Sequence, residues 1–89
     1  MPYITKSLRE QLDDKITEMI EMLGQISEDN LDGCLNYTIS RLLIELYERR
    51  YAKINRAIGV LECVKLEYYR RFAAPYEDKK ASENGDIYG

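Results

Sequence analysis

The middle of the chain gathers side chains that could bind an anionic, stackable ligand. Residues 41–71 hold eight basic and four acidic residues, a net charge of +4, whereas the remaining residues hold five basic and twelve acidic ones, a net charge of −7. Arginine binds phosphate through paired hydrogen bonds and tyrosine stacks on a base. We expect the cations to hold phosphate, an amide to hold ribose or a base edge, and a tyrosine to stack. The candidate ligand-binding residues are Arg41, Asn55, Arg56, Lys65, Tyr69 and Arg70.

The same residues have a second interpretation, in which arginines pair with glutamates on solvated helix faces. Glu45–Arg49 and Glu67–Arg71 have the i,i+4 spacing that such pairs need, and each pair contributes only a few tenths of a kcal/mol. Lys65 differs from the other cations because its helical angle places it within an apolar stripe. A lysine there must extend to water, find an acidic partner or face a cavity.

The composition argues against most catalytic chemistry. The 89 residues include no His and no Trp, and they contain no Gly-rich phosphate loop and no cluster with metal-ligand spacing. We therefore predict a protein that is not an enzyme, with no catalytic residues, no cofactor and no metal. Cys34 and Cys63 lie 29 residues apart without a CxxC pairing, which favours two reduced thiols over a disulfide or a reactive thiol.

Charge and hydropathy bear on partners and location. A net charge of −3 makes duplex nucleic acid an unlikely partner. No apolar run is long enough to span a membrane, and the first residues do not resemble a signal peptide. We therefore expect a cytoplasmic protein, in the host cytoplasm if a phage encodes it.

Two prolines and five glycines in the whole chain indicate an all-helical protein. Apolar residues at three- and four-residue steps predict a first helix over 7–26, capped by Ser7 or restarted at Asp13. A polar linker over 27–33 leads to a second helix over 33–49. Its main apolar face is Leu35, Ile39, Leu42, Leu43 and Leu46, and its opposite face carries Tyr37, Arg41 and Ile44.

A third helix over 51–74 is predicted to be the central one. A broad apolar stripe occupies one face, and a seam of Ala52, Gly59, Cys63 and Leu66 occupies the other. Glycine costs about 1 kcal/mol relative to alanine inside a helix, so Gly59 indicates the close approach of another backbone. Pro75 predicts a kink or a short fourth helix over 75–83, followed by a tail over 84–89. The expected fold is a single-domain, three-helix antiparallel bundle over residues 1–89.

A bundle of this size cannot cover two-sided helices by itself, because small domains bury only about 60–65% of their unfolded surface. We therefore predict a homo-oligomer, a two-fold dimer or higher, that shares the third helix. The alternative is a compact monomer that leaves a few apolar side chains at the surface.

Several segments resemble one family of proteins of similar length and unknown function, found in phages, prophages and bacteria. They are NYTISRLL at 36–43, INRAIGVLECVK at 54–65 and YYRRFAAPYEDKK at 68–80. The resemblance covers essentially the whole chain and carries over no catalytic or ligand-binding residues. Small helical phage proteins include anti-defence sponges, which sequester cyclic or ADP-ribose-type nucleotides without cleaving them. This chain is similar to them in size, helicity and its Arg/Tyr-rich middle.

The leading hypothesis is a non-enzymatic, phage-type binding protein that sequesters a phosphate-bearing nucleotide signal at an oligomer interface. The alternative is a protein–protein adaptor or inhibitor, in which Tyr37, Arg41 and Ile44 bind a host or phage protein. The first hypothesis predicts stabilisation by a nucleotide. The second predicts a dominant polypeptide partner.

Overall fold

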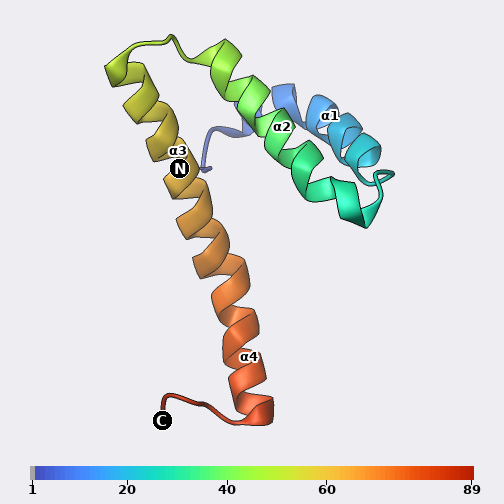
Figure 1. Cartoon of the computed structure of the whole chain (residues 1–89), viewed down its shortest axis with the longest axis vertical. Helices are drawn as coiled ribbons and strands as arrows, with labels where there is room; N and C mark the ends of the chain where they lie inside the picture. The colour runs from blue at the N-terminus through green and yellow to red at the C-terminus, as the bar shows by residue number, and fades with distance from the viewer. Residues whose placement is uncertain (1) are drawn as a thin grey trace. The chain divides into compact units, whose positions relative to one another are not determined.

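The structure, a computed structural model, describes residues 2–89, and its secondary structure is helical throughout (Figure 1). The elements are α1 (Lys6–Leu23), α2 (Glu28–Leu46), α3 (Tyr51–Tyr68), the π-helical turn η1 (Tyr69–Ala73) and α4 (Ala74–Asn84). No strand occurs among these residues. The predicted all-α class is confirmed, as is a long third helix, because α3, η1 and α4 follow one another without a loop.

Helix α1 begins and ends at residues that satisfy its free backbone groups. The Thr5 side chain accepts a hydrogen bond from the Leu8 N–H, at 3.3 Å, and so caps the helix. This replaces the predicted caps at Ser7 and Asp13, because Thr5 has the extended backbone that a capping residue needs. The Gly24 N–H bonds to the Ile20 carbonyl at 2.8 Å, and the helix ends there, three residues before its predicted end.

The predicted polar linker over 27–33 is wrong, because helix α2 already begins at Glu28. Ser27 adopts an extended backbone, and its carbonyl accepts the first helical bond from Leu31 at 3.0 Å. Glu28 and Asp29 lie in the first turn, where negative charge is favoured by the helix dipole. The helix ends at Leu46 because Tyr47 returns to an extended conformation. The linker is thus shorter and the second helix lies earlier than the sequence indicated.

The chain divides into two compact units, Pro2–Ala57 and Ile58–Gly89. In the first unit α1 and α2 contact each other and lie side by side as a helical hairpin (Figure 1). The second unit contains the rest of α3, the π turn, α4 and the tail. The single-domain interpretation stays a prediction.

The short fourth helix expected at Pro75 is present as α4, and a π turn leads into it. The Ala74 N–H bonds to the Tyr69 carbonyl, five residues earlier, which is the π pattern. A proline inside an α-helix lacks its N–H and clashes with the carbonyl four residues before it. The wider turn relieves that clash, and Pro75 then occupies the start of α4, where its missing N–H is not needed.

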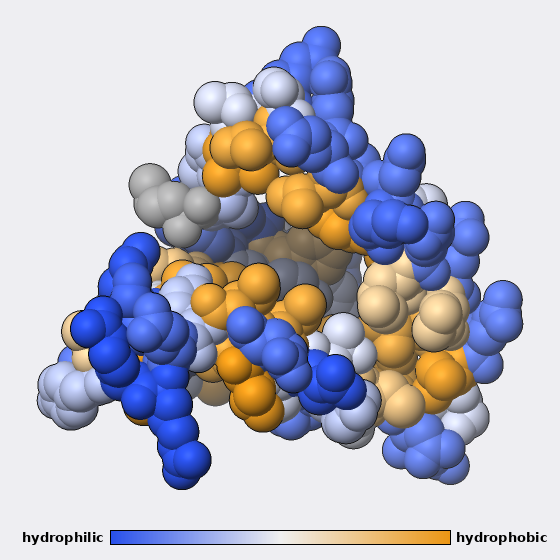
Figure 2. Space-filling view, turned by 90° about the horizontal axis from the view of Figure 1, so that it is seen from above, coloured by the Kyte–Doolittle hydropathy of each residue, from blue (hydrophilic) through white to orange (hydrophobic). Residues whose placement is uncertain are grey.

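Very little of the described chain is buried. Ala57, at 8% exposure, is the only buried residue among residues 2–89. The main face predicted for α2 remains largely open at Leu42 and Leu46. Figure 2 shows hydrophobic side chains (orange) at the surface beside hydrophilic ones (blue).

The central helix was expected to be wrapped on both flanks, and within the second unit no other helix lies beside it. The small-residue seam of α3 is exposed at Ala52, Gly59, Cys63 and Leu66. A methyl group placed on Gly59 would meet nothing within 4 Å. The close approach expected at Gly59 is therefore not made within the second unit.

Candidate functional site

The outer face of α2 presents a pre-arranged Tyr–Arg pair. One guanidinium nitrogen of Arg41 donates a hydrogen bond to the Tyr37 hydroxyl at 3.1 Å, and the guanidinium carbon lies 5.9 Å from the centre of the Tyr37 ring. Glu45 lies 4.0 Å from the other guanidinium nitrogen. Ile44 falls on the same face by helical spacing, and its side chain is exposed. We refer to Tyr37, Arg41 and Ile44 as the α2 face.

The end of α2 and the start of α3 carry a cluster of positive charge. Arg50 lies 3.7 Å from Glu48, whereas no ion pair forms at Arg49, Lys53 or Arg56 among residues 2–89. The first turn of α3 contains no acidic residue. These cations lie near the positive end of a helix dipole, where positive charge is disfavoured and an anion would be stabilised.

Lys65 and Arg70 of the second unit have acidic partners on their own helix. Lys65 lies 3.4 Å from the Glu62 carboxylate, so it takes an acidic partner while remaining exposed. Arg70 donates to both carboxylate oxygens of Glu67, at 3.2 and 3.0 Å. These contacts are exposed and contribute little to stability.

The i,i+4 pairs expected from the sequence are replaced by other pairs. Arg49 lies beyond the end of α2, so helical spacing no longer brings it to Glu45, and Arg41 takes that carboxylate instead. Arg71 lies within the π turn, where the rotation per residue differs, and Arg70 pairs with Glu67. The helix boundary and the turn type decided these partners.

Tyr69 makes a side-chain hydrogen bond to a residue eight positions along the second unit. Its hydroxyl donates to a Glu77 carboxylate oxygen at 2.6 Å, across the π turn and Pro75. This hydrogen bond, together with the negative charge of Glu77, raises the pKa of the Tyr69 phenol above its ordinary value. Sequence reasoning missed Glu77 because the two residues are eight positions apart, beyond the usual helical pairs.

The six predicted ligand-binding residues divide between the two units. Arg41, Asn55 and Arg56 belong to Pro2–Ala57, and Lys65, Tyr69 and Arg70 belong to Ile58–Gly89. Four of the six have the local partners described above. Asn55 and Arg56 are exposed, and no hydrogen bond or ion pair joins them to Arg41 within the described residues.

A shallow cavity of about 510 Å³ lies where α1 passes to α2, and sequence reasoning missed it. Its lining contains one charged residue, the acidic Asp29, and no cation, which does not suit a phosphate. The lining residues are Gln25, Ile26, Ser27, Asp29, Asn30, Gly33 and Cys34.

Cys34 and Cys63 are both unpaired, as expected, and Cys63 is exposed. Over residues 2–89, no group of His, Cys, Asp or Glu side chains is arranged to hold a metal ion. None of the helices in this part of the chain has the length and apolar character needed to cross a membrane.

These observations define an all-α protein with open helix faces. Residues 1–87 match a family model described as a domain of unknown function (DUF6899), and the chain belongs to that family. No curated protein and no solved structure was found to match the chain.

Proposed function

We propose that the protein is a non-enzymatic protein-binding module, an adaptor or inhibitor, that binds another protein through its α2 face. The observation that carries the proposal is the exposed Tyr37–Arg41 pair, held by a hydrogen bond of 3.1 Å. Tyrosine and arginine are enriched among the residues that dominate binding energy at protein interfaces.

The geometry of the pair favours a protein partner. Arg41 is held over the Tyr37 ring before any partner arrives, so less side-chain freedom is lost on binding. Ile44 adds an aliphatic side chain that is 71% exposed beside the pair. A partner suited to this face offers an apolar pocket for Ile44 and a carboxylate that competes with Glu45 for Arg41.

Affinity capture with the full-length chain tests the proposal through a matched pair of variants. Ile44→Glu places a charge on the α2 face, whereas Leu46→Glu places it two residues along the same helix, on a different face and at similar exposure (73%). We expect the wild type and Leu46→Glu to retain one dominant polypeptide and Ile44→Glu to lose it. Equal retention by both variants, or none by the wild type, contradicts the proposal.

Capture of a phosphate-bearing nucleotide is the second candidate, and the unpaired cations at the start of α3 favour it. Arg49, Lys53 and Arg56 lie near a helix N-terminus with no acidic residue in its first turn, and the exposed Tyr51 offers a ring for stacking. In this form the protein is an anti-defence sponge, with its ligand held at an oligomer interface.

A thermal-shift panel of nucleotides, cyclic nucleotides and ADP-ribose derivatives tests this second candidate. A ligand at about 100 times its dissociation constant stabilises the folded state by about 2.7 kcal/mol. We expect Arg56→Ala to remove the shift and Arg9→Ala, which removes one cation from α1, to retain it. A flat response across the panel contradicts nucleotide capture and leaves the protein-binding proposal untouched.

A further inference from the structure

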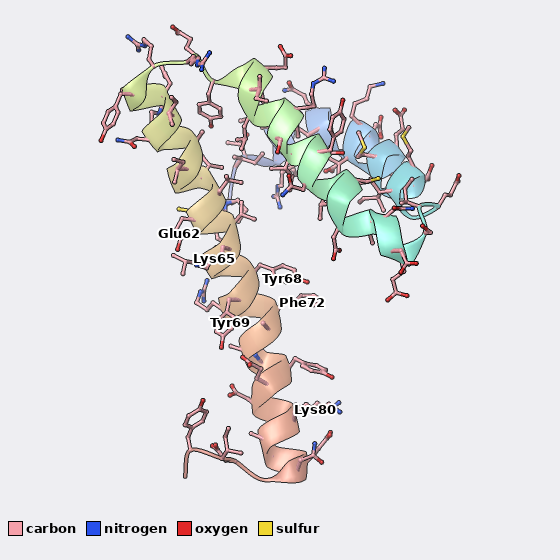
Figure 3. All side chains as sticks on the ribbon, viewed as in Figure 1. Glu62, Lys65, Tyr68, Tyr69, Phe72 and Lys80 are labelled. Carbon is pink, nitrogen blue, oxygen red and sulfur yellow. The ribbon has the colours of Figure 1, made fainter. Side chains whose placement is uncertain are left out.

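The second unit carries three exposed aromatic rings in line along one helix. Tyr68 and Phe72 stack with their ring centres 5.2 Å apart and 14° between their planes. Tyr76 follows four residues later, and the Lys80 ammonium lies 5.7 Å from the centre of its ring. Figure 3 shows Tyr68, Phe72 and Lys80 on one side of the helix and Tyr69 on the other. We call Tyr68, Phe72 and Tyr76 the aromatic stripe.

The aromatic stripe crosses the π turn. In an α-helix, with 3.6 residues per turn, side chains four apart drift around the axis. A π turn bonds each residue to the fifth along and winds more residues into one turn, so side chains four apart come closer to alignment. The turn at Tyr69–Ala73 begins directly after Tyr68 and contains Phe72, and the two rings stack there.

No part of the second unit covers the stripe. The unit is one continuous helical segment with a short tail, and Phe72 remains 68% exposed. Tyr68 and Tyr76 are similarly open. Three adjacent exposed rings form a patch of the kind that marks an interaction site.

We infer that the aromatic stripe is the interface through which two copies of this chain associate, antiparallel about a two-fold axis at Phe72. The surface differs from the α2 face and lies in the other unit, so the inference does not depend on the proposed function.

The spacing of the stripe is self-complementary. Tyr68 and Tyr76 each lie four residues from Phe72, so an antiparallel copy places Tyr68 against the partner's Tyr76 and Phe72 against the partner's Phe72. A two-fold interface requires this property, because the same patch must serve both subunits. Aromatic pairs contribute about 0.5–1.5 kcal/mol beyond the area they bury.

The charge of the second unit and the area of the aromatic stripe agree with a second, antiparallel copy of the chain covering the stripe. Residues 58–71 hold three basic and two acidic residues, a net of +1, and residues 72–84 hold two basic and three acidic ones, a net of −1. Antiparallel pairing brings these opposite signs together, whereas parallel pairing brings like signs together. The three rings offer about 400 Å², roughly half of the ~800 Å² per partner of a standard interface. Leu61 and Val64 extend the same face.

The mass of the full chain in solution, measured by light scattering across a concentration series, tests the surface. We expect a dimer for the wild type, at least about a thirtyfold higher dissociation constant for Phe72→Glu, and no change for Leu66→Glu. Leu66 is the matched control because it is exposed on the opposite side of the same helix. Circular dichroism establishes that each variant remains helical.

Disulfide cross-linking tests the antiparallel register in chains whose own cysteines are replaced. Phe72→Cys should cross-link to itself, and a mixture of Tyr68→Cys and Tyr76→Cys should cross-link across the two variants. Self-cross-linking of Tyr68→Cys and of Tyr76→Cys instead identifies a parallel pair and overturns the register. A wild-type monomer, a dimer that survives Phe72→Glu, or a dimer lost only in Leu66→Glu overturns the interface.

Discussion

The two units of the chain use similar helices but differ in how much of each helix is covered. In Pro2–Ala57, α1 and α2 contact each other, and partly covered side chains recur along α2 at Leu31, Cys34 and Thr38. In Ile58–Gly89, apart from Glu67, only alanines of the helical segment are partly covered, and every aromatic ring is exposed. The hairpin has a neighbour within its own unit, whereas the long helix has none. A helix gains most of its stability from packing its apolar face, and the second unit by itself offers the long helix no surface for this packing.

The largest predicted effect is a difference in hydrogen exchange between the units. If a second copy covers the stripe, dilution to one hundredth of the dimerising concentration should speed exchange of amides in 58–84 by up to about 100-fold and leave α1 and α2 nearly unchanged. Hydrogen exchange read by mass spectrometry at two concentrations checks this. Exchange that does not change with concentration in either unit would contradict the prediction that a second copy covers residues 58–84.

Ala57 lies at the end of the hairpin unit and is its one buried residue among those described. Ala57→Leu overfills that position, and we expect a loss of about 1–3 kcal/mol in unfolding free energy. Chemical denaturation measures the loss. Ala52→Leu, at an exposed position of the same helix, is the control and should change stability by less than about 0.5 kcal/mol. Equal losses would contradict the view that the hairpin unit holds the covered side chains.

Thr5 caps α1, and its removal weakens the hairpin by a smaller amount. Because the Thr5 hydroxyl bonds the Leu8 N–H, Thr5→Ala should lower the unfolding free energy by about 1 kcal/mol. The Ser27 hydroxyl accepts from the exposed Asn30 side chain at 2.9 Å and not from a backbone N–H of α2, so Ser27→Ala should cost less. Thermal denaturation of both variants compares them. The reverse order would show that the caps do not act as the structure indicates.

The smallest effect concerns Tyr69 and Glu77 in the long helix. The pKa of the Tyr69 phenol is raised, so the folded state holds this proton more tightly than the unfolded state. The contribution of the Tyr69–Glu77 bond to the free energy of unfolding is fully present below the ordinary tyrosine pKa of about 10. It is lost as the pH rises through the raised pKa. Glu77→Gln should lower the pH midpoint at which Tyr69 loses its proton, as measured by carbon NMR of the tyrosine rings. Tyr76, on the aromatic stripe, serves as an internal control.

The helical class and the helices of the second half of the chain were predicted correctly from the sequence. The all-α class, the long third helix and a short fourth helix at Pro75 follow from helical periodicity and from proline's missing N–H. The second helix was placed too late because the polar residues after Ser27 were taken as a linker. They are the first turns of a helix, where acidic side chains are favourable.

The site was less predictable than the helices. Arg41 and Tyr37 are four apart, so helical spacing alone could have identified their contact. The same holds for the four-residue steps from Tyr68 to Lys80. Tyr69 and Glu77 could not be paired in this way, because their contact depends on a π turn that single-residue preferences do not reveal.

The sequence by itself determined where the helices lie and how they are charged, because periodicity, caps and proline act within a few residues. Only the tertiary structure decided which faces are covered, since covering a face depends on a neighbour that the local pattern does not specify. It left open space beside Gly59, gave Lys65 a partner on its own helix, and joined Tyr69 to Glu77 across the π turn.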